Sequence, residues 1–413
     1  MLVRPGADRL SWRVVTSTAR RLAEIRGGVP PRRHNARTIA ALTGNPGCER
    51  RAVLDSAGVD KPGLAERVGF PARFGQSRFA ITRGNAFEAQ VKADGGAELL
   101  RLVAVRLGVD PGGPAIWTDL GVDDRPGRNR RARLADRSGA PDRSGAPDRS
   151  GAPGRAGQPG RAARSRAALA AAAPTGAAEP AALFDHPLLG LDVAGQRVHL
   201  EPDLVAARLA GRFHVVEIKS FPVIDGQADP GKVAAAAIQS AVYVLALREL
   251  LAAEGHDEEL VSPDVVLVCP RDFANQPLAS LVDVRKQLLV LRRQLDRMAR
   301  IDDLLARVPA GFTADPAADP ARLRRSLSSV PARYAPECLA ACELAYFCRH
   351  ETRAETAALG RPVREALGGV ATVAEVLALA GGSDPGTPEQ AEAAALLRAA
   401  ARLRADALAG QPA

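Results

Sequence analysis

Short stretches of the chain alternate apolar and polar residues, whereas longer stretches repeat apolar residues with a helical period. The stretch VVEIKS, residues 215–220, places Glu217 and Lys219 two positions apart among β-branched residues. Side chains of a strand point alternately to its two faces, so the two charged groups share one face while Val216 and Ile218 share the other. The pattern predicts either an exposed edge strand or a strand that carries a metal site with a lysine beside it.

The segment from residue 196 to 220 predicts a β-hairpin with ARLAGR as its turn. If the hairpin folds about a point near Ala210, Asp203 lies opposite Glu217, because each of the two residues is seven positions from Ala210. Cross-strand neighbours lie about 5 Å apart at Cβ, and two carboxylates so close repel each other unless a cation lies between them. Oxygen ligands of this kind suit Mg²⁺ or Mn²⁺, and Lys219 on the same face would orient a metal-bound water or stabilise charge on a phosphate.

Other segments predict a helical envelope around an α/β core. A long helix is expected after Asp229, with that residue as N-cap, Pro230 in the first turn and Gly255 as the stop. DVVLVCP predicts a buried strand, and residues 281–308 predict a second long helix.

Changes in composition divide the chain into four segments. Residues 1–120 predict an N-terminal helical region, and residues 121–180 contain the repeat DRSGAPDRSGAPDRSGAP, which lacks apolar periodicity and predicts a disordered insertion. Residues 181–350 are expected to form the core with its cysteine cluster, and residues 351–413 an Ala-rich helical tail.

The overall composition narrows the class of protein. The hydrophobic fraction is 46% and the net charge is +9, which favours a globular protein with a polyanionic partner such as nucleic acid. The sequence shows neither an uninterrupted apolar run of membrane-spanning length nor a signal-peptide pattern. A cytoplasmic protein without a membrane partner is therefore expected.

Three more polar residues join the candidate site. Gln239 and Tyr243 stand one turn apart on the long helix, in otherwise apolar surroundings. Glu88, in RGNAFEAQV, is expected in the first turns of a helix and is a possible third carboxylate.

Asp203, the Glu217-x-Lys219 strand and the Gln239-x-x-x-Tyr243 helix together resemble the PD-(D/E)XK nucleases, in particular the RecB-like exonuclease branch. The resemblance spans about residues 45–350, apart from the insertion. It implies a restriction-endonuclease-like core, in which helices flank a mixed central sheet, with a mostly helical cap.

The resemblance also implies a role for each residue of the site. Asp203 and Glu217 would bind the catalytic divalent metal with help from the backbone carbonyl of Ile218, and Lys219 would assist the attacking water. Gln239 and Tyr243 would organise the site and the DNA strand. The first motif of the family often has a histidine four residues after a glycine, whereas Gly84 is followed at that offset by Glu88. Glu88 would then replace the histidine as a metal ligand.

Three of the five cysteines lie within the eleven residues CLAACELAYFC, which points to a metal. RecB-like relatives with an iron–sulfur cluster, namely AddB-type helicase–nucleases and a CRISPR-adaptation nuclease family, carry one cysteine before the nuclease motifs and three after them. This pattern implies a structural [4Fe–4S] cluster, with a four-cysteine zinc site as the alternative, on the ligands Cys48, Cys338, Cys342 and Cys348.

The remaining candidate ligands are expected to be structural. Cys269 lies in the predicted buried strand and is expected to be an ordinary core residue. His199, His214 and His350 lack a partner at ligand spacing.

The sequence thus predicts a Mg²⁺- or Mn²⁺-dependent DNA nuclease, either a single-strand exonuclease or a flap nuclease. It would act alone or beside a helicase or other repair or defence proteins. The alternatives are a catalytically silent DNA-binding subunit of such a complex and an RNA-directed nuclease. Asp203, Glu217 and Lys219 are all present, which favours an enzyme over a silent subunit.

Overall fold

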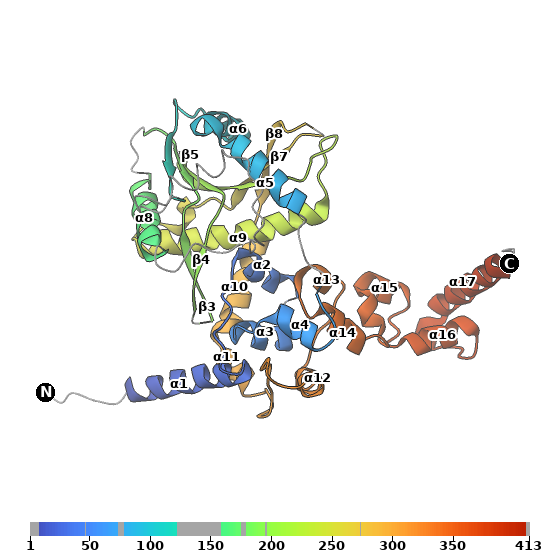
Figure 1. Cartoon of the computed structure of the whole chain (residues 1–413). Coiled ribbons are helices and arrows are strands. Elements are labelled where there is room, and N and C mark those ends of the chain that lie inside the picture. The colour runs from blue at the N-terminus through green and yellow to red at the C-terminus, as the bar shows by residue number, and fades with distance from the viewer. Residues whose placement is uncertain are drawn as a thin grey trace, which may run out of the picture. The chain divides into compact units, whose positions relative to one another are not determined.

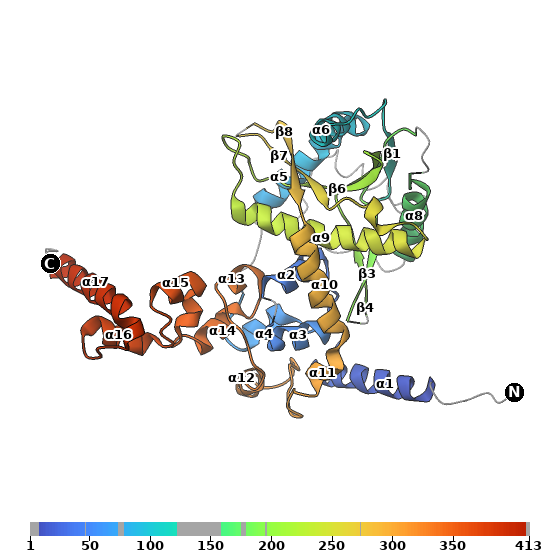
Figure 2. The same cartoon turned by 180° about the vertical axis from the view of Figure 1, so that it is seen from behind.

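The computed structural model describes seven stretches of the chain: residues 8–45, 47–72, 78–121, 158–174, 179–194, 196–272 and 274–409. Internal contacts divide the chain into two compact units, whose elements are labelled in Figure 1 and seen from behind in Figure 2. The first unit comprises Met1–Arg33, Gly44–Gly75 and Arg297–Ala413, and the second comprises His34–Thr43 and Gln76–Asp296. Each unit therefore combines segments that are distant in sequence.

The second unit contains a mixed β-sheet flanked by helices, which confirms the predicted α/β class. In its described part the sheet has six strands, in the spatial order β1, β2, β5, β6, β7, β8. The pairs β1–β2 and β6–β7 are parallel, and the other neighbouring pairs are antiparallel. The strands are β1 Ile116–Asp119, β2 Ala182–Asp185, β5 Leu204–Leu209, β6 Arg212–Ile218, β7 Asp264–Pro270 and β8 Pro277–Asp283.

Six described α-helices lie wholly or mostly in the second unit. Side chains of α5 and α6 pack against Val216 and Ile218 of β6, so these two residues share a face as predicted. On the opposite face, Ala236 of α9 packs against Leu267 and Cys269 of β7. The helices are α2 Ala36–Gly44, α5 Arg78–Val91, α6 Ala97–Leu107, α8 Gln158–Ala171, α9 Pro230–Ala253 and α10 Arg285–Ala299.

Helix α9 starts and stops where the sequence predicted. Asp229 Oδ1 accepts the backbone N–H of Lys232 at 2.9 Å, Pro230 is the first helical residue, and Gly255 has a positive φ of 83° just beyond the end. Among the described residues, α9 is the one helix long and apolar enough to cross a membrane by length and composition alone. In this structure 67% of its most apolar window is buried inside the protein, as in a core helix.

Two predicted elements differ from the structure. Residues 196–200 form β4, which pairs with β3 (Leu189–Val193) in a separate two-stranded sheet instead of extending the hairpin. Pro202 lacks a backbone N–H and interrupts the chain between β4 and β5. The helix predicted over residues 281–308 is confirmed for most of that range, but its first residues complete β8 and it is divided into α10 and α11 at Arg300. Asp283 then accepts the N–H of Arg285 at 2.8 Å, where α10 begins.

Helix α8 lies inside the range 121–180, for which the sequence predicted disorder, and the prediction is wrong for these residues. Arg161, Ser165 and Leu169 recur at a spacing of four and are all buried, so one face of the helix packs into the unit. Residues 122–157, which hold the hexapeptide repeat, and 175–178 lie outside the described residues.

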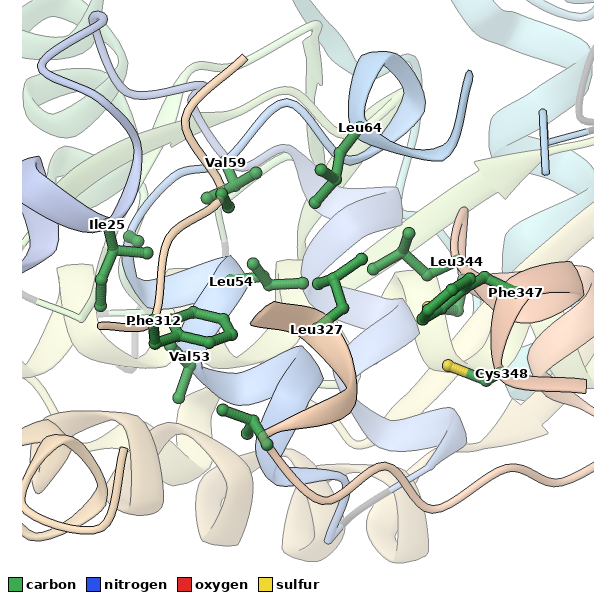
Figure 3. Close-up of a cluster of buried hydrophobic side chains, with 14 of the residues drawn as sticks. Ile25, Val53, Leu54, Val59, Leu64, Phe312, Leu327, Leu344, Phe347 and Cys348 are labelled. Carbon is green, nitrogen blue, oxygen red and sulfur yellow. The ribbon is translucent and has the colours of Figure 1, made fainter. Parts of the chain in front are cut away.

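The first unit is mainly helical in its described part. Its core combines side chains of α1, α3, α4, α12 and α14, including Ile25, Leu54, Leu64, Leu327 and Phe347 (Figure 3). The helices are α1 Asp8–Ile25, α3 Glu49–Ser56, α4 Lys61–Arg67, α11 Ile301–Leu305, α12 Pro320–Ser328, α13 Cys338–Ala341, α14 Ala345–Glu351, α15 Arg361–Ala366, α16 Val373–Gly381 and α17 Ala391–Ala409.

Candidate functional site

The hairpin of β5 and β6 aligns the two carboxylates as predicted. Leu204 pairs with Val216 in the antiparallel register, so Asp203, one residue before β5, falls opposite Glu217. The side chain of Asp203 is fixed by the backbone of the other strand, because its Oδ2 accepts the N–H of Ile218 at 2.8 Å. The observed turn is shorter than the predicted one, because β5 continues to Leu209 and only Ala210 and Gly211 lie between the strands.

Glu217 is a fully buried acid. Burial raises the pKa of its carboxyl to about 8, the nearby charge of Asp203 adds to this rise, and Lys219 opposes it. The ammonium of Lys219 pairs with Oε1 of Glu217, whereas Oε2 has no hydrogen-bond partner among the described residues. A buried carboxylate oxygen without a donor favours the approach of a cation or a proton.

Asp203 and Lys219 belong to the same electrostatic group. Burial raises the pKa of Asp203, the charge of Lys219 opposes this, and the charge of Glu88 adds to it. Burial alone would lower the pKa of Lys219, but the charges of Glu217 and Asp203 raise it. Lys219 is therefore held as an ammonium beside the two carboxyl groups.

The two polar residues of α9 face this group. Gln239 Nε2 donates to the hydroxyl of Tyr243 at 3.1 Å. Tyr243 is buried, and burial together with the charges of Glu217 and Asp203 raises its pKa well above the ordinary value. The structure thus brings together Asp203, Glu217, Lys219, Gln239 and Tyr243.

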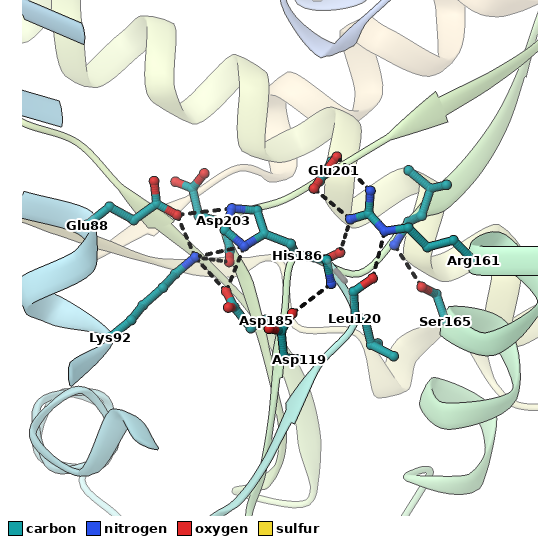
Figure 4. A network of polar contacts seen from close by, with 12 residues as sticks. Glu88, Lys92, Asp119, Leu120, Arg161, Ser165, Asp185, His186, Glu201 and Asp203 are labelled. Atoms are coloured by element: carbon teal, nitrogen blue, oxygen red, sulfur yellow. Dashed lines mark hydrogen bonds and ion pairs between the residues drawn. The ribbon is translucent and has the colours of Figure 1, made fainter. Parts of the chain in front are cut away.

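Glu88 also lies near Asp203, but it already has cationic partners (Figure 4). Its Oε1 is 2.5 Å from Lys92 Nζ and 3.1 Å from His186 Nε2. Burial would raise its pKa, but the hydrogen bond from His186 and the charge of Lys92 lower that pKa to about 2. The prediction that Glu88 lies in the first turns of its helix is wrong, because α5 begins at Arg78 and Glu88 lies near its end.

The sequence reasoning missed three neighbours of Glu88: Lys92, Asp185 and His186. Lys92 Nζ lies 2.6 Å from Asp185 Oδ1 and donates to the carbonyl of Asp203 at 2.8 Å. His186 Nδ1 lies 2.8 Å from the same Asp185 oxygen. Burial would lower the pKa of His186, but the hydrogen bonds to Asp185 and Glu88 raise it to about 10. One indication was available, since Lys92 follows Glu88 by one helical turn.

The donors suit a hard divalent cation, although they are not arranged as a complete site. Asp203, Glu217 and the carbonyl of Ile218 offer oxygen atoms, the ligand type preferred by Mg²⁺ and Mn²⁺. The unpaired Oε2 of Glu217 is the atom that most needs such a partner. As placed, no three His, Cys, Asp or Glu side chains in the described ranges are grouped so as to hold a metal ion.

All four predicted cluster ligands lie in the first unit. Cys48 immediately precedes α3, Cys338 opens α13, Cys342 follows α13, and Cys348 lies in α14. Cys48 is half-buried and the other three are buried. Burial raises the pKa of Cys348 to about 12, Arg50 opposes this rise, and the charges of Cys342 and Cys48 add to it. Cys48, Cys342 and Cys348 are therefore electrostatic neighbours.

Polar donors already contact two of these sulfur atoms. Asn45 Nδ2 donates to Cys338 Sγ at 3.1 Å, and Arg50 Nη1 donates to Cys348 Sγ at 3.3 Å. N–H donors of this kind stabilise anionic sulfur, whereas burial raises the pKa of Cys342 and Cys348 and favours the thiol form. As placed in the described residues, no three of the cysteines are grouped so as to hold a metal ion. Cys269 belongs to β7 in the second unit and is buried in its core, as the sequence predicted.

Searches against protein-family models, curated proteins and solved structures found no match to this chain.

Proposed function

We propose that the chain is a divalent-metal-dependent nuclease of the RecB-like branch of the PD-(D/E)XK superfamily, with a restriction-endonuclease-like core. The main support is the buried carboxyl group of Glu217, which has an unpaired Oε2, lies opposite Asp203 and has Lys219 beside it. A mixed sheet with helices on both faces is compatible with that core.

Each residue of the site has a defined part in this proposal. Asp203, Glu217 and the Ile218 carbonyl would hold the cation, with Glu88 as a further ligand once it releases Lys92. A bound Mg²⁺ or Mn²⁺ supplies activation of water and neutralisation of phosphate charge. Lys219 orients the attacking water and stabilises the charge that develops on the phosphate. Gln239 and Tyr243 position the nucleic acid strand from α9.

The cysteines would hold a structural [4Fe–4S] cluster, for which zinc is the alternative. Binding of one metal centre by Cys48, Cys338, Cys342 and Cys348 would link the residue that precedes α3 to the helices α13 and α14. The charge of +9 supports an extended polyanion as substrate, and we propose single-stranded DNA. A helicase or another repair or defence protein would be a partner, and the cytoplasm the site of action.

The test is digestion of end-labelled single-stranded DNA with Mn²⁺ by protein purified without oxygen. Glu217→Gln and Asp203→Asn should abolish cleavage, and Lys219→Ala should reduce it by about 10²–10³-fold while Mn²⁺ still binds. Matched controls are Glu98→Gln and Lys232→Ala, two exposed positions of the second unit that should cleave like the wild type.

Each contrary result identifies a different alternative. Wild-type protein that binds DNA without cleaving it under any metal would be a silent DNA-binding subunit. Cleavage of RNA in preference to DNA would change the substrate. Full activity of Glu217→Gln would rule out this site as the nuclease centre.

A further inference from the structure

Arg161 is a buried arginine whose partners all lie beside the candidate site. Its side chain projects from α8 and is 3% exposed. Its Nε donates to the carbonyl of Leu120 at 2.6 Å, and its Nη2 donates to the carbonyl of His186 at 2.6 Å. The guanidinium also forms a two-pronged ion pair with Glu201, at 2.6 and 3.2 Å (Figure 4).

The three acceptors belong to three chain segments that lead into the site. Leu120 directly follows β1, His186 directly follows β2, and Glu201 stands two residues before Asp203. Backbone hydrogen bonds link the same segments, since Leu120 N–H donates to the carbonyl of Asp185 at 2.9 Å and His186 N–H donates to that of Asp203 at 3.4 Å. Arg161 therefore joins the ends of three strands where the carboxyl groups gather.

The backbone of His186 shows why such a partner is needed. His186 has a φ of 48°, in the left-handed region that residues with a side chain seldom adopt. This conformation persists only when surrounding contacts hold it. The Arg161 guanidinium bonds the carbonyl of His186, while the ring of the same residue contacts Glu88 and Asp185.

Glu201 pairs with the guanidinium and also acts electrostatically on Tyr243 of α9. Its carboxylate lies close enough to Tyr243 that its charge adds to the pKa rise caused mainly by burial of the phenol. The planar guanidinium fits that carboxylate with both prongs, a geometry that an ammonium does not reproduce. The ion pair also anchors the segment that leads to Asp203.

We propose that Arg161 is a positioning residue of the candidate metal site. It fixes the backbone of His186 at the end of β2, and it fixes the segment from Glu201 to Asp203, so that Asp203 is held opposite Glu217, ready for a cation. This inference rests on the proposed function and extends it to α8, a helix outside the nuclease motifs. Arg161 is buried and bonded to three acceptors, so it acts through these residues and not as a metal ligand.

The experiment compares Arg161→Gln, Arg161→Lys and Glu201→Gln with a control on the same helix, Arg166→Gln. Arg166 is exposed and pairs with Glu254 at 3.2 Å. Three quantities are measured for each protein: Mn²⁺ affinity by calorimetry, the Mn²⁺ concentration for half-maximal cleavage with the KM for DNA, and amide hydrogen exchange.

Arg161→Gln should weaken Mn²⁺ affinity by about 10–100-fold, as expected for loss of an outer partner of metal ligands. The half-maximal Mn²⁺ concentration should rise by a similar factor, while the KM for DNA stays unchanged. Amide exchange should accelerate at residues 184–187 and 200–204. Glu201→Gln should change the Mn²⁺ affinity, the half-maximal Mn²⁺ concentration and the amide exchange less, because the hydrogen bonds of Arg161 to the carbonyls of Leu120 and His186 remain. Arg161→Lys should fall between wild type and Arg161→Gln, and Arg166→Gln should match the wild type.

The outcomes separate this inference from the proposed function. Wild-type Mn²⁺ affinity and exchange in Arg161→Gln would overturn the positioning role. So would a lower melting temperature with unchanged Mn²⁺ affinity, which indicates a structural role only.

If Arg161→Gln fails to fold, Glu201→Gln decides by the same measurements. If the wild type binds Mn²⁺ without cleaving nucleic acid, the proposed function fails while affinity and exchange still judge Arg161. If it does not bind Mn²⁺, both fail.

Discussion

Two glutamates show how strongly the surroundings of a single residue set its chemistry. Glu217 is buried opposite Asp203, and burial with that neighbouring charge raises its pKa to about 8. Burial would also raise the pKa of Glu88, but the hydrogen bond from His186 and the charge of Lys92 lower it to about 2. The protein compensates the charge of Glu88 more completely, so under the proposed function a divalent cation would stabilise the site most at Glu217.

At the residue scale, His214 predicts a pH dependence of stability. It is buried on β6, with Nε2 3.2 Å from the carbonyl of Leu209. Burial lowers the pKa of His214 below the ordinary value of 6.5. As the pH falls below 6.5, the unfolded chain binds a proton at this histidine that the folded protein excludes. The free energy of unfolding therefore decreases.

One such histidine contributes a slope of at most about 1.4 kcal/mol per pH unit. His214→Gln should flatten the fall in stability between pH 7 and the folded-state pKa, measured by urea unfolding at several pH values. The control is His256→Gln, an intermediate-exposure histidine outside the strands. Identical pH profiles for His214→Gln and wild type would contradict the prediction.

At the element scale, one hairpin and one helix assemble most of the candidate site. The two strands β5 and β6 place Asp203 opposite Glu217, and α9 adds Gln239 and Tyr243 from the same side. The hairpin is closed by Ala210 and Gly211, with φ values of 50° and 67°. A two-residue turn with both φ values positive matches the right-handed twist of its strands, but an alanine fits it poorly.

Ala210→Asn should therefore stabilise the protein by about 0.5–1 kcal/mol, because asparagine followed by glycine favours this turn. Ala210 is exposed, so the new side chain displaces no neighbour. Thermal unfolding provides the measurement, with Ala210→Val as the opposite case, since a β-branched residue fits a positive φ worst. A melting temperature that falls with asparagine would show that the turn does not limit stability.

Helix α8 leads to a prediction about the inserted segment. Deletion of residues 122–157 should leave stability nearly unchanged, whereas extending the deletion through residue 171 should destabilise the protein strongly. The larger deletion removes Arg161, Ser165 and Leu169, which are buried, and leaves their partners exposed or unpaired. Thermal melts of both deletions test this, and equal melting temperatures would show that α8 contributes no stability.

At the scale of the whole molecule, segments far apart in sequence meet within each unit. In the first unit, Leu54 and Leu64 pack in one core with Leu327 and Phe347. The cysteines follow the same division, because Cys48 comes from the early segment and the other three candidate ligands from the late one. A metal held by all four would therefore link the two segments.

The cysteine prediction uses metal content and colour. Cys48→Ser should lose the visible absorption of an iron–sulfur cluster, or zinc if that metal is bound, and should unfold at a lower temperature. Cys269→Ser should keep the metal, because Cys269 is 1% exposed in the core of the other unit. Retained metal in Cys48→Ser, with loss in Cys269→Ser, would reverse the assignment of the fourth ligand.

The sequence alone determined the features that depend on local periodicity and chain chemistry. Alternation in residues 215–220 set the two faces of β6. Counting positions along the hairpin predicted Asp203 opposite Glu217, and the strands reach this register through a one-residue shift between Ala206 and Leu209. An aspartate, a proline and a glycine set the ends of α9. These features need only neighbours in sequence, or two strands joined by a short turn.

Tertiary structure decided what depends on contacts between distant segments. His186 meets Glu88 across 98 positions, at the end of a strand of only four residues, too short to show a clear period. Helix α8 follows a repeat that favours disorder, and burial of Arg161 depends on partners at Leu120, His186 and Glu201. Packing and buried hydrogen bonds, which no local pattern records, outweighed the local propensity there.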